Sequence, residues 1–354
     1  MNLFDNALLS QLRNFFQCEY IIPVGSGTAG LYLALKYYGV EGKHVMVPSL
    51  ACPNICVAVM AAGGIPLIVD VSSLDGNIST NAVKSRIDAS VKAIIAVDSF
   101  GYPADLKTLK EIASPYGCKV IDDACQAYGG SINGERVGCL GDMGVISFGY
   151  SKPIALQGGG LLIVPNKNAL NGILELMRTN SNSPVSLFKN WLSLNLSLSS
   201  KYGLFKFLTN HGLLNYNFPE ILKQKLHMTW QLFEQDLPAV KSNLKKAREI
   251  ISTLNDIDTF DYIDGDWLPW RYSFMITSGE TQDRFLRLSK KLHIKSSRLY
   301  KPLNIVSNKF LFRNPYPTSP SKNIFDSIFN LRYATTRNST NQLIEKIKSF
   351  RKFW

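Results

Sequence analysis

Residues 119–152 read KVIDDACQAYGGSINGERVGCLGDMGVISFGYSK, and this stretch decides which fold the sequence predicts. Two short apolar runs lie in it, Lys119–Asp123 and Gly144–Phe148. Runs of about five apolar residues bounded by glycine and polar residues are typical of buried strands. We therefore predict two buried strands here, each followed by polar residues.

Three charged residues lie at or shortly after the ends of these strands. A buried strand that serves only the fold does not require charged residues there. Asp122 and Asp123 end the first run, and adjacent residues of a strand point to opposite faces, so the two acids need different explanations. One acid at a strand end can cap a following helix. Lys152 lies in a short loop between the second run and three glycines, although lysine normally lies on a solvated surface. These residues are candidates for catalysis.

Outward from this stretch, strand-like and helical patterns alternate between residues 20 and 166. The further strands that we predict are Val45–Pro48, Pro66–Val71, Ala93–Phe100 and Gly160–Val164, and the helices include Thr28–Tyr38, Pro53–Ala62 and Asp105–Ser114. Strands that alternate with helices indicate an α/β fold, a three-layer large domain whose mostly parallel sheet has helices on both faces and right-handed crossovers. Ligands of such sheets bind beyond the carboxyl ends of the strands.

After residue 166 the pattern changes. A helix is predicted over 167–180, a long helical pattern over about 226–254 links two domains, and a strand lies within 267–278. We predict a large domain of residues 1–235 and a smaller α+β C-terminal domain of residues 236–354. The amphipathic helix predicted within residues 1–16 belongs to the first domain or packs on the second.

The sequence GSGTAG at residues 25–30 follows an apolar run and opens a predicted helix. A helix N-terminus binds phosphate through unpaired N–H groups and a partial positive charge, and Ser26 and Thr28 add hydroxyls. The same G-x-G-x-x-G pattern occurs in dinucleotide sites, so an NAD-dependent oxidoreductase is one alternative. The acid expected at the end of a second strand is missing, because Glu41 comes too early and Asp70 too late. A helix start that needs glycine only for close packing is the purely structural interpretation.

A phosphate anchor at Thr28, an acid at Asp123 and an amine at Lys152 are together the contacts that pyridoxal phosphate (PLP) requires. The acid keeps the pyridine nitrogen protonated, so that the ring acts as an electron sink. A charge-assisted bond of this kind contributes about 1.5–3 kcal/mol. A partly desolvated lysine has free amine available to form a Schiff base. We therefore predict a PLP enzyme.

In these motifs the sequence resembles the DegT/DnrJ family of nucleotide-sugar aminotransferases, which are fold-type I PLP enzymes. The resemblance runs from about residue 26 to residue 166. Its motifs are SGTA at 26–29, GIP at 64–66, VDV at 69–71, GYPAD at 101–105, DDACQAYG at 122–129, GD at 141–142, SF at 147–148 and finally Lys152. The order and spacing of these motifs are highly specific.

The resemblance implies roles for individual residues. Lys152 carries PLP as a Schiff base, Asp123 faces the pyridine nitrogen, and Gln126 lies against the ring near its phenolic oxygen. Gly27, Thr28, the backbone of Ala29 and Ser147 hold the phosphate. The implied reaction moves an amino group from an amino acid, glutamate by resemblance, to a keto sugar on a nucleoside diphosphate, in surface polysaccharide or amino-sugar biosynthesis. The family's enzymes are homodimers with sites at the subunit interface, so the resemblance implies a homodimer.

The sequence departs from the family pattern at four places. Cys52 stands near the position of an aromatic residue that stacks on the ring, and Tyr128 stands where a histidine is usual. The glycine run 157–160 lacks the usual acid. The family's Asn-x-Arg segment, through which a neighbouring subunit reaches the phosphate, has no clear counterpart, which leaves Lys225 and His227 as candidates. These differences put the substrate in doubt more than the cofactor.

The net charge of +12 is concentrated towards the C-terminus, where sixteen Lys and Arg from Arg284 onward face only Asp326 and Glu345. A basic surface attracts anions, so either a solvated face or an anion-binding patch is expected. This region motivates a third function class, a non-catalytic PLP-fold regulator or partner protein. No helix-turn-helix or aromatic-basic groove indicates nucleic-acid binding.

The remaining composition indicates a globular cytoplasmic protein. The N-terminus lacks the basic start and apolar stretch of a signal peptide, and no run of about 18 apolar residues could span a membrane. The leucine- and aromatic-rich stretch 184–220 packs on the large domain or, as a peripheral contact, rests on a membrane surface. Six scattered cysteines are expected to be reduced thiols. Cys52 and Cys56 lack further ligands, so no metal is expected.

Overall fold

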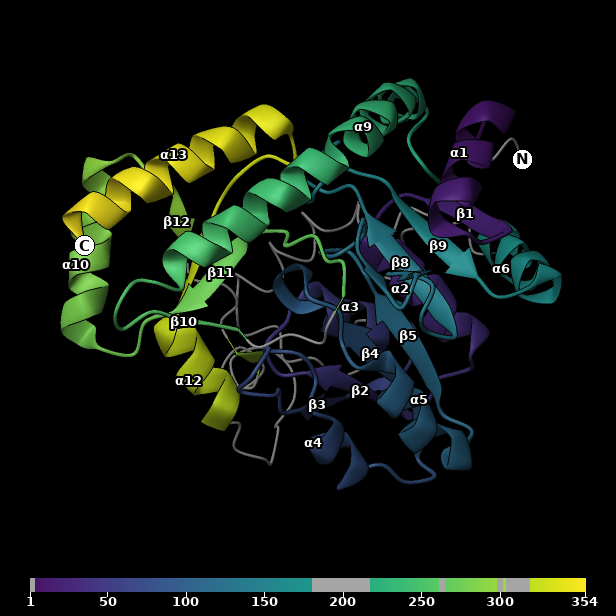
Figure 1. Ribbon diagram of the computed structural model, residues 1–354. Helices are drawn as coiled ribbons and strands as arrows, with labels where there is room; N and C mark the ends of the chain where they lie inside the picture. Colours follow the sequence, from purple (N-terminus) through teal and green to yellow (C-terminus); the bar gives the residue numbers. More distant parts are fainter. Residues whose placement is uncertain (1–3, 180–216, 261–264, 298–301, 304–318) are drawn as a thin grey trace, which may run out of the picture.

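The computed structural model describes residues 4–179, 217–260, 265–297, 302–303 and 319–354. Two sheets form the centres of two layered regions, and the long helix α9 (Glu220–Ile251) runs from one to the other (Figure 1). Residues 184–216, for which the sequence left two interpretations open, lie outside the described residues.

The larger sheet has seven strands in the order β1-β9-β8-β5-β4-β2-β3. Their bounds are β1 Tyr20–Val24, β2 His44–Pro48, β3 Ile65–Val69, β4 Val91–Val97, β5 Lys119–Asp123, β8 Met143–Ser147 and β9 Gly160–Val164. The pairs from β3 through β2, β4 and β5 to β8 are parallel, whereas β9 is antiparallel to both β8 and β1. The prediction of a mostly parallel sheet is confirmed.

All six strands predicted between residues 45 and 164 are present, and two have the predicted bounds. The prediction for residues 93–100 is too long, because the chain leaves β4 after Val97 and enters a tight turn, η1 (Ser99–Gly101). Phe100 in this turn has a φ of 60°, which a strand residue does not adopt. The turn places residues 98–101 at the end of β5 instead of continuing the strand.

Helices cover both faces of the larger sheet, and this confirms the predicted α/β fold class. On one face lie α2 (Gly27–Tyr37), α3 (Asn54–Ala61) and α6 (Lys167–Thr179), and on the other lie α4 (Thr80–Lys84) and α5 (Leu106–Ala113). Strand β4 shows the alternation that this requires. Ile95 packs towards α2 and α3, and Ile94 packs towards α4 and α5.

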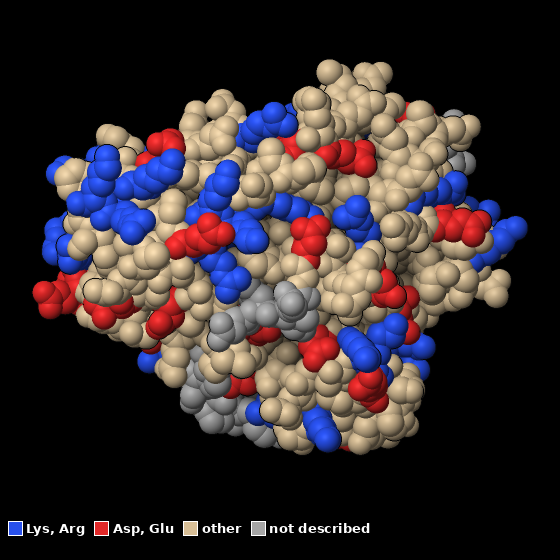
Figure 2. Space-filling model, viewed as in Figure 1, with Lys and Arg blue, Asp and Glu red and all other residues tan. Residues whose placement is uncertain are grey.

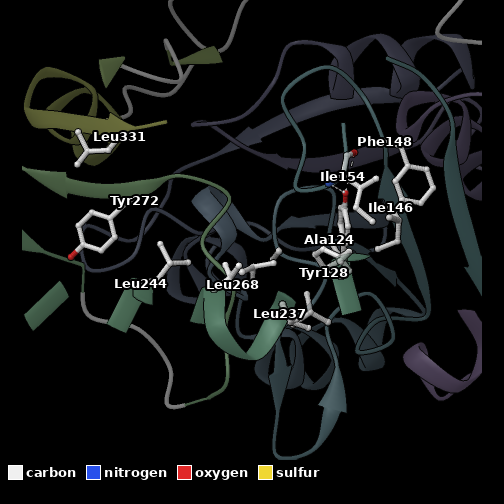
Figure 3. Close-up of a cluster of buried hydrophobic side chains, with 14 of the residues drawn as sticks. Ala124, Tyr128, Ile146, Phe148, Ile154, Leu237, Leu244, Leu268, Tyr272 and Leu331 are labelled. Carbon is white, nitrogen blue, oxygen red and sulfur yellow. Dashed lines mark hydrogen bonds between the residues drawn. The ribbon is translucent and has the colours of Figure 1, made fainter. Parts of the chain in front are cut away.

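An aromatic cluster joins the sheet to α9 and to the N-terminal helix α1 (Asn6–Phe16). Trp230 of α9 is fully buried and contacts Phe15 at a ring distance of 5.1 Å and Phe148 at 6.4 Å. Phe233, one turn further along α9, contacts Tyr128 at 6.0 Å. Helix α1 therefore packs on the large sheet and the first half of α9. Figure 3 shows how this core continues from Tyr128 and Phe148 to Leu244, Tyr272 and Leu331 of the second region.

The second region is an antiparallel sheet with helices. Its strands are, in spatial order, β10 (Asp258–Thr259), β11 (Tyr272–Met275), β13 (Ile328–Leu331) and β12 (Ser296–Ser297), and its helices are α10 (Gly279–Lys291), α12 (Ser319–Ser327) and α13 (Arg337–Phe353). The remaining elements are the short hairpin β6 (Ser131–Ile132) and β7 (Glu135–Arg136) and the 3-10 turn η2 (Ser114–Tyr116).

The proposed boundary between residues 235 and 236 falls inside α9. The first half of the helix contacts Phe15 and Tyr128, whereas Asn243 donates to Thr340 (3.0 Å) and Asn341 (2.7 Å) on α13. The division into domains of 1–235 and 236–354 therefore stays a prediction, with one continuous helix as the connection.

Lysine and arginine side chains gather over α10 and α13, at the left of Figure 2. Several of them contact neighbours on the same surface. Lys348 pairs with Glu345 (2.8 Å), and Lys346 donates to the carbonyl of His293 (3.0 Å). The choice between a solvated face and an anion patch stays open. No helix in the described part of the chain combines the length and apolar character that a membrane span requires.

Candidate active site

The N-terminus of α2 lies at one end of the larger sheet and is packed tightly against two other strand ends. Ser26 caps the helix by accepting a hydrogen bond from Ala29 N–H (3.0 Å). A Cβ atom on Gly27 would lie 2.8 Å from Cys125 Sγ and 3.0 Å from Ser147 Cβ, so only glycine fits. The glycine therefore lets the ends of β1, β5 and β8 meet.

Asp123 ends β5 beside this junction and is buried. Its Oδ1 accepts a hydrogen bond from Cys125 N–H (3.2 Å). Burial raises the pKa of the Asp123 carboxyl, and hydrogen bonding by Cys125 and the positive charge of Lys152 oppose that rise.

Lys152 follows β8 in a tight loop and is half-buried. Its backbone N–H donates to the carbonyl of Gly149 (3.1 Å), and Gly149 N–H donates to Ser147 Oγ (3.3 Å). At the start of α2, Thr28 is half-buried, whereas the residues on either side of it are buried. Thr28, Asp123 and Ser147 therefore lie at the ends of neighbouring elements, with Lys152 in the loop after β8, and their roles towards a cofactor stay predictions.

Tyr128 fixes the far side of the lysine loop, a contribution that sequence reasoning missed. Its hydroxyl accepts from Ile154 N–H (2.7 Å) and donates to the Ile154 carbonyl (3.4 Å), as the dashed lines in Figure 3 show. Both groups are buried. In the sequence, Tyr128 differs from the family pattern, which usually has a histidine at this position. That difference is the only feature of the sequence that points to a special contact of Tyr128.

Two polar groups that were predicted to contact the cofactor already form hydrogen bonds within the protein. The Ala29 N–H, predicted to bind phosphate, donates to the capping Ser26 Oγ. The side-chain oxygen of Gln126 accepts from Phe100 N–H (3.1 Å), so Gln126 is held by the turn that follows β4. The roles of Ala29 and Gln126 towards a cofactor stay predictions.

A segment of the second region forms the opposite wall of the site. Trp270 donates its indole N–H to the carbonyl of Ser151, and its ring lies 5.3 Å from Lys152 Nζ. Its backbone N–H donates to the carbonyl of Phe100 (3.0 Å). A Cβ on Gly101 would lie 2.2 Å from the same backbone nitrogen, so glycine is required for this close approach.

A cavity of about 310 Å³ is lined by Lys152 and Trp270, whereas Thr28, Asp123 and Ser147 are not part of its lining. Its lining includes Arg271 and Arg332 but no aspartate or glutamate in the described part of the chain. Arg271 is 7% exposed, stacks on Trp270 at 4.2 Å and donates to Ser297 Oγ (2.6 Å). Three cations without a carboxylate favour an anionic ligand. Arg271 and Arg332 could not be predicted as neighbours from the sequence, because they come from segments far apart in the chain.

The other residues that the sequence offered near the cofactor, Lys225, His227 and Cys52, do not line this cavity either. Lys225 is exposed on α9, and His227 Nδ1 lies 3.8 Å from Asp5 Oδ2. Cys52 is half-buried and interacts electrostatically with Cys56 and Cys125. No cluster of three or more His, Cys, Asp or Glu side chains suitable for a metal is present among the described residues.

The glycine motif does not occupy the position that a dinucleotide fold requires. In that fold the motif joins two parallel strands of one βαβ unit. Here β1 is an edge strand, and its described partner, β9, is antiparallel to it. The motif therefore provides a helix N-terminus at the site without the rest of an NAD fold.

The comparison with known families decides between the remaining interpretations. The model of the DegT/DnrJ/EryC1/StrS aminotransferase family matches residues 5–250, which is more than half of the chain. The chain belongs to this family. The resemblance that the motifs predicted is confirmed, and the NAD-dependent and non-catalytic alternatives gain no support.

Several curated proteins resemble the chain. It is 32% identical over 158 residues to a GDP-perosamine synthase of Escherichia coli O157:H7, covering 44% of this chain and 43% of that protein. It is 34% identical over 159 residues to a UDP-N-acetyl-3-dehydro-alpha-D-glucosamine 3-aminotransferase of Acidithiobacillus ferrooxidans, covering 45% and 43%. The matches thus span less than half the length of these DegT/DnrJ/EryC1/StrS relatives.

Solved structures of the family have the same fold over nearly the whole chain. An aminotransferase from Psychrobacter cryohalolentis superposes with a TM-score of 0.79 at 16% identity, covering 97% of this chain and 90% of that chain. An E. coli GDP-4-keto-6-deoxy-D-mannose-3-dehydratase with bound hydrated PLP gives 0.76 at 17% identity, covering 99% and 92%. The predicted fold-type I architecture is confirmed.

Proposed function

We propose that the protein is a PLP-dependent aminotransferase that moves an amino group from an amino acid to a keto sugar carried by a nucleoside diphosphate. The observation that supports this best is the meeting of Asp123, Lys152 and the N-terminus of α2 at the ends of β5, β8 and β1. The family match supports the same reaction class.

The residues at this junction fit PLP. The start of α2 lacks acidic residues in its first turn, and Thr28 is its half-buried hydroxyl residue, so a phosphate meets favourable charge there. Asp123 is a buried carboxylate with an ammonium group nearby, as the partner of a pyridinium nitrogen should be. PLP bound there would act as an electron sink for the substrate's bonding electrons.

Each residue has a defined task in this proposal. Asp123 would accept a hydrogen bond from the protonated pyridine nitrogen, and Thr28 and Ser147 would donate hydroxyl hydrogens to the phosphate. Lys152 Nζ would hold the cofactor in its resting state. Once displaced, Nζ is the base best placed to take up a proton beside the reacting carbon and return it one bond further along.

The fold alone does not choose the reaction, because the similar structures include both an aminotransferase and a dehydratase. Lys152 favours amino transfer, since a tethered amine is the group that both holds the cofactor and moves the proton. The cations Arg271 and Arg332 beside the 310 Å³ cavity suit the carboxylate of an amino-acid donor. The relatives with GDP- and UDP-sugar names support a nucleotide-linked keto sugar as acceptor.

Location and assembly are part of the same proposal. We expect the protein in the cytoplasm, where a nucleotide-linked substrate is available to it. We expect a homodimer in which α9 of one subunit, through Lys225 or His227, reaches the phosphate site at Thr28 and Ser147 of the other. Exposed apolar side chains on this part of α9, Ile221, Met228 and Leu232, support a covered surface.

The test is an ultraviolet–visible spectrum of the purified protein with PLP, before and after excess L-glutamate. A band near about 410–430 nm should form and move to about 330 nm when the amino group is transferred to the cofactor. The matched control is glutamate added to the Lys152→Ala variant, in which no band at about 330 nm should appear because the amine that moves the proton is missing. A protein that stays colourless with PLP would refute the proposed function. If the band does not change with glutamate but shifts with another amino acid, that amino acid is the donor.

A further inference from the structure

Two buried carboxyl groups face each other behind the proposed cofactor site. Asp98 follows β4 and Asp122 precedes Asp123 in β5, and both side chains are fully buried. Asp122 points away from the face that Asp123 occupies, because neighbouring strand residues alternate. Neither Asp98 nor Asp122 takes part in the mechanism proposed above.

One oxygen of each carboxyl group is bound to backbone N–H groups. Asp122 Oδ2 accepts from Gly138 N–H (2.8 Å) and Leu140 N–H (3.1 Å). Asp98 Oδ1 accepts from Ala104 N–H (2.9 Å). The other two oxygens, Asp98 Oδ2 and Asp122 Oδ1, are buried and have no hydrogen-bond partner in the described structure. Asp98 directly follows β4, which pairs with β5, and the two side chains interact directly with each other.

Two buried acceptor oxygens side by side repel each other unless a proton lies between them. We infer that Asp98 and Asp122 share one proton, donated from Asp98 Oδ2 to Asp122 Oδ1, and that this bond positions Asp123 and Gln126 for the cofactor. The proton belongs on Asp98 because Asp122 accepts two backbone hydrogen bonds and Asp98 only one. The carboxyl group with more N–H donors is the better place for the negative charge.

The charged and titratable groups around the pair agree with this assignment. Burial, followed by the charge of Asp122, raises the pKa of Asp98 well above its ordinary value, and Asp123 adds to the rise. Burial raises the pKa of Asp122 to about 6, although its hydrogen bonds oppose this. Cys139 also faces Asp122, and its hydrogen bond with Cys18 raises the pKa of Cys139, so this thiol stays neutral.

The bond fixes the turn that holds two predicted cofactor residues. The N–H of Asp98 donates to the carbonyl of Asp123 (3.2 Å), so the backbones of the two residues are joined directly. Phe100, in the same turn, has a positive φ of 60° and donates its N–H to Gln126 Oε1. A strained turn persists only when its surroundings hold it. Asp98 and Asp122 are therefore positioning residues, with no contact to substrate.

The experiment uses asparagine in place of each acid. In Asp98→Asn the amide oxygen can still accept from Ala104 N–H, and the amide N–H can donate to Asp122 Oδ1. In Asp122→Asn the amide N–H donates to an ionised Asp98. At about pH 5, where the wild-type pair keeps its proton, each single variant keeps one donor between the two side chains, so its Tm should stay within about 2 °C of the wild type at that pH.

The double variant Asp98→Asn/Asp122→Asn distinguishes one shared proton from two ionised carboxyl groups. With both oxygens bound to backbone N–H groups, two amide NH₂ groups face each other and no hydrogen bond can form. The Tm should fall by at least about 5 °C, far more than the sum of the single effects. If the carboxyl groups were both ionised, each single variant would instead raise the Tm and the double variant would raise it further. That pattern would overturn the inference.

The pH dependence gives a second readout. A raised pKa in the fold means that Asp98 keeps its proton when the unfolded chain has lost it. The free energy of unfolding therefore falls as the pH rises from about 4 until the pair has released its proton. Asp98→Asn lacks this group, so the Tm of the variant minus that of the wild type should grow between about pH 5 and the pH of proton release. A constant difference would contradict a shared proton.

The dissociation constant for PLP tests separately whether the bond positions Asp123 and Gln126. Only this measurement rests on the proposed function. Asp98→Leu removes the donor and leaves Ala104 N–H and Asp122 Oδ1 without partners, and it should raise the Kd for PLP about tenfold or more. Asp98→Asn should restore the wild-type Kd. If both variants bind PLP equally well while the Tm pattern holds, the proton is shared but does not position Asp123. If the wild type binds no PLP, the proposed function fails while the Tm test stands.

Discussion

The candidate site has two walls, one from each layered region of the structure. They differ in how closely their sequences follow the family pattern. The first wall consists of short loops after β1, β5 and β8, and its motifs lie inside the family match of residues 5–250. The second wall consists of Trp270, Arg271 and Arg332, which lie beyond that match.

This difference follows from what each wall must do. A cofactor of fixed shape needs one acid, one amine and one phosphate anchor, and strand ends place them rigidly. A substrate needs a cavity of the right charge and size, and many side chains can supply these. Substitutions in the first wall should therefore change cofactor chemistry or local stability, and substitutions in the second wall should change substrate affinity.

The largest effect is expected for Lys152→Ala. Loss of the amine that holds the cofactor and moves the proton should lower kcat for amino transfer at least about 1,000-fold and abolish the 410–430 nm band. Lys107→Ala removes an exposed lysine of α5, far from every proposed contact with cofactor or substrate, and serves as the control. Equal losses in the two variants would mean that Lys152 has no special role.

The next largest effect is expected for Asp123→Asn, which keeps the shape of the side chain and removes its charge. The pyridine nitrogen would lose its charged partner, so kcat should fall about 10- to 100-fold while the cofactor stays bound through Lys152. Asp105→Asn is the control, because asparagine can also cap α5. Unchanged kcat in Asp123→Asn would remove Asp123 from the cofactor site.

Tyr128→Phe tests the support of the lysine loop. The substitution leaves the buried Ile154 N–H without a partner, which costs about 1–3 kcal/mol of unfolding free energy. Denaturant titration measures this loss. Tyr150→Phe is the matched control, because Tyr150 is 76% exposed in the same loop region, and it should be neutral. Equal stability of the two variants would show that the Tyr128 bonds contribute nothing.

The smallest effect is expected on the second wall. Arg271→Gln removes a cation that lines the cavity, so the KM for an amino-acid donor should rise about tenfold with kcat nearly unchanged. Arg271→Lys keeps the charge and should recover part of the affinity. A fall in kcat with an unchanged KM would place Arg271 in the chemical step and erase the distinction between the two walls.

The same distinction explains how much the sequence could predict. Asp123, Ser147 and Lys152 were predictable because each follows a short apolar run in a parallel sheet, where local order determines the strand end. Arg271 and Arg332 were not, because only the packing of β11 and β13 brings them to Lys152. The end of β4 was misjudged because Asp98 and Phe100 form a turn through contacts with β5 and Gln126, which no local pattern encodes.

The position of β1 has a consequence for synthesis on the ribosome. Tyr20 pairs with Val164, and β9 is the last strand of the larger sheet to be made. At about 5–20 residues per second, the first strand waits on the order of ten seconds for its partner. During that time the helix start at Gly27 has no β9 behind it, so a nascent chain cannot offer a finished phosphate site. Cofactor capture therefore belongs to the end of large-domain synthesis, and a chain that stops before residue 160 is left with an open sheet edge prone to aggregation.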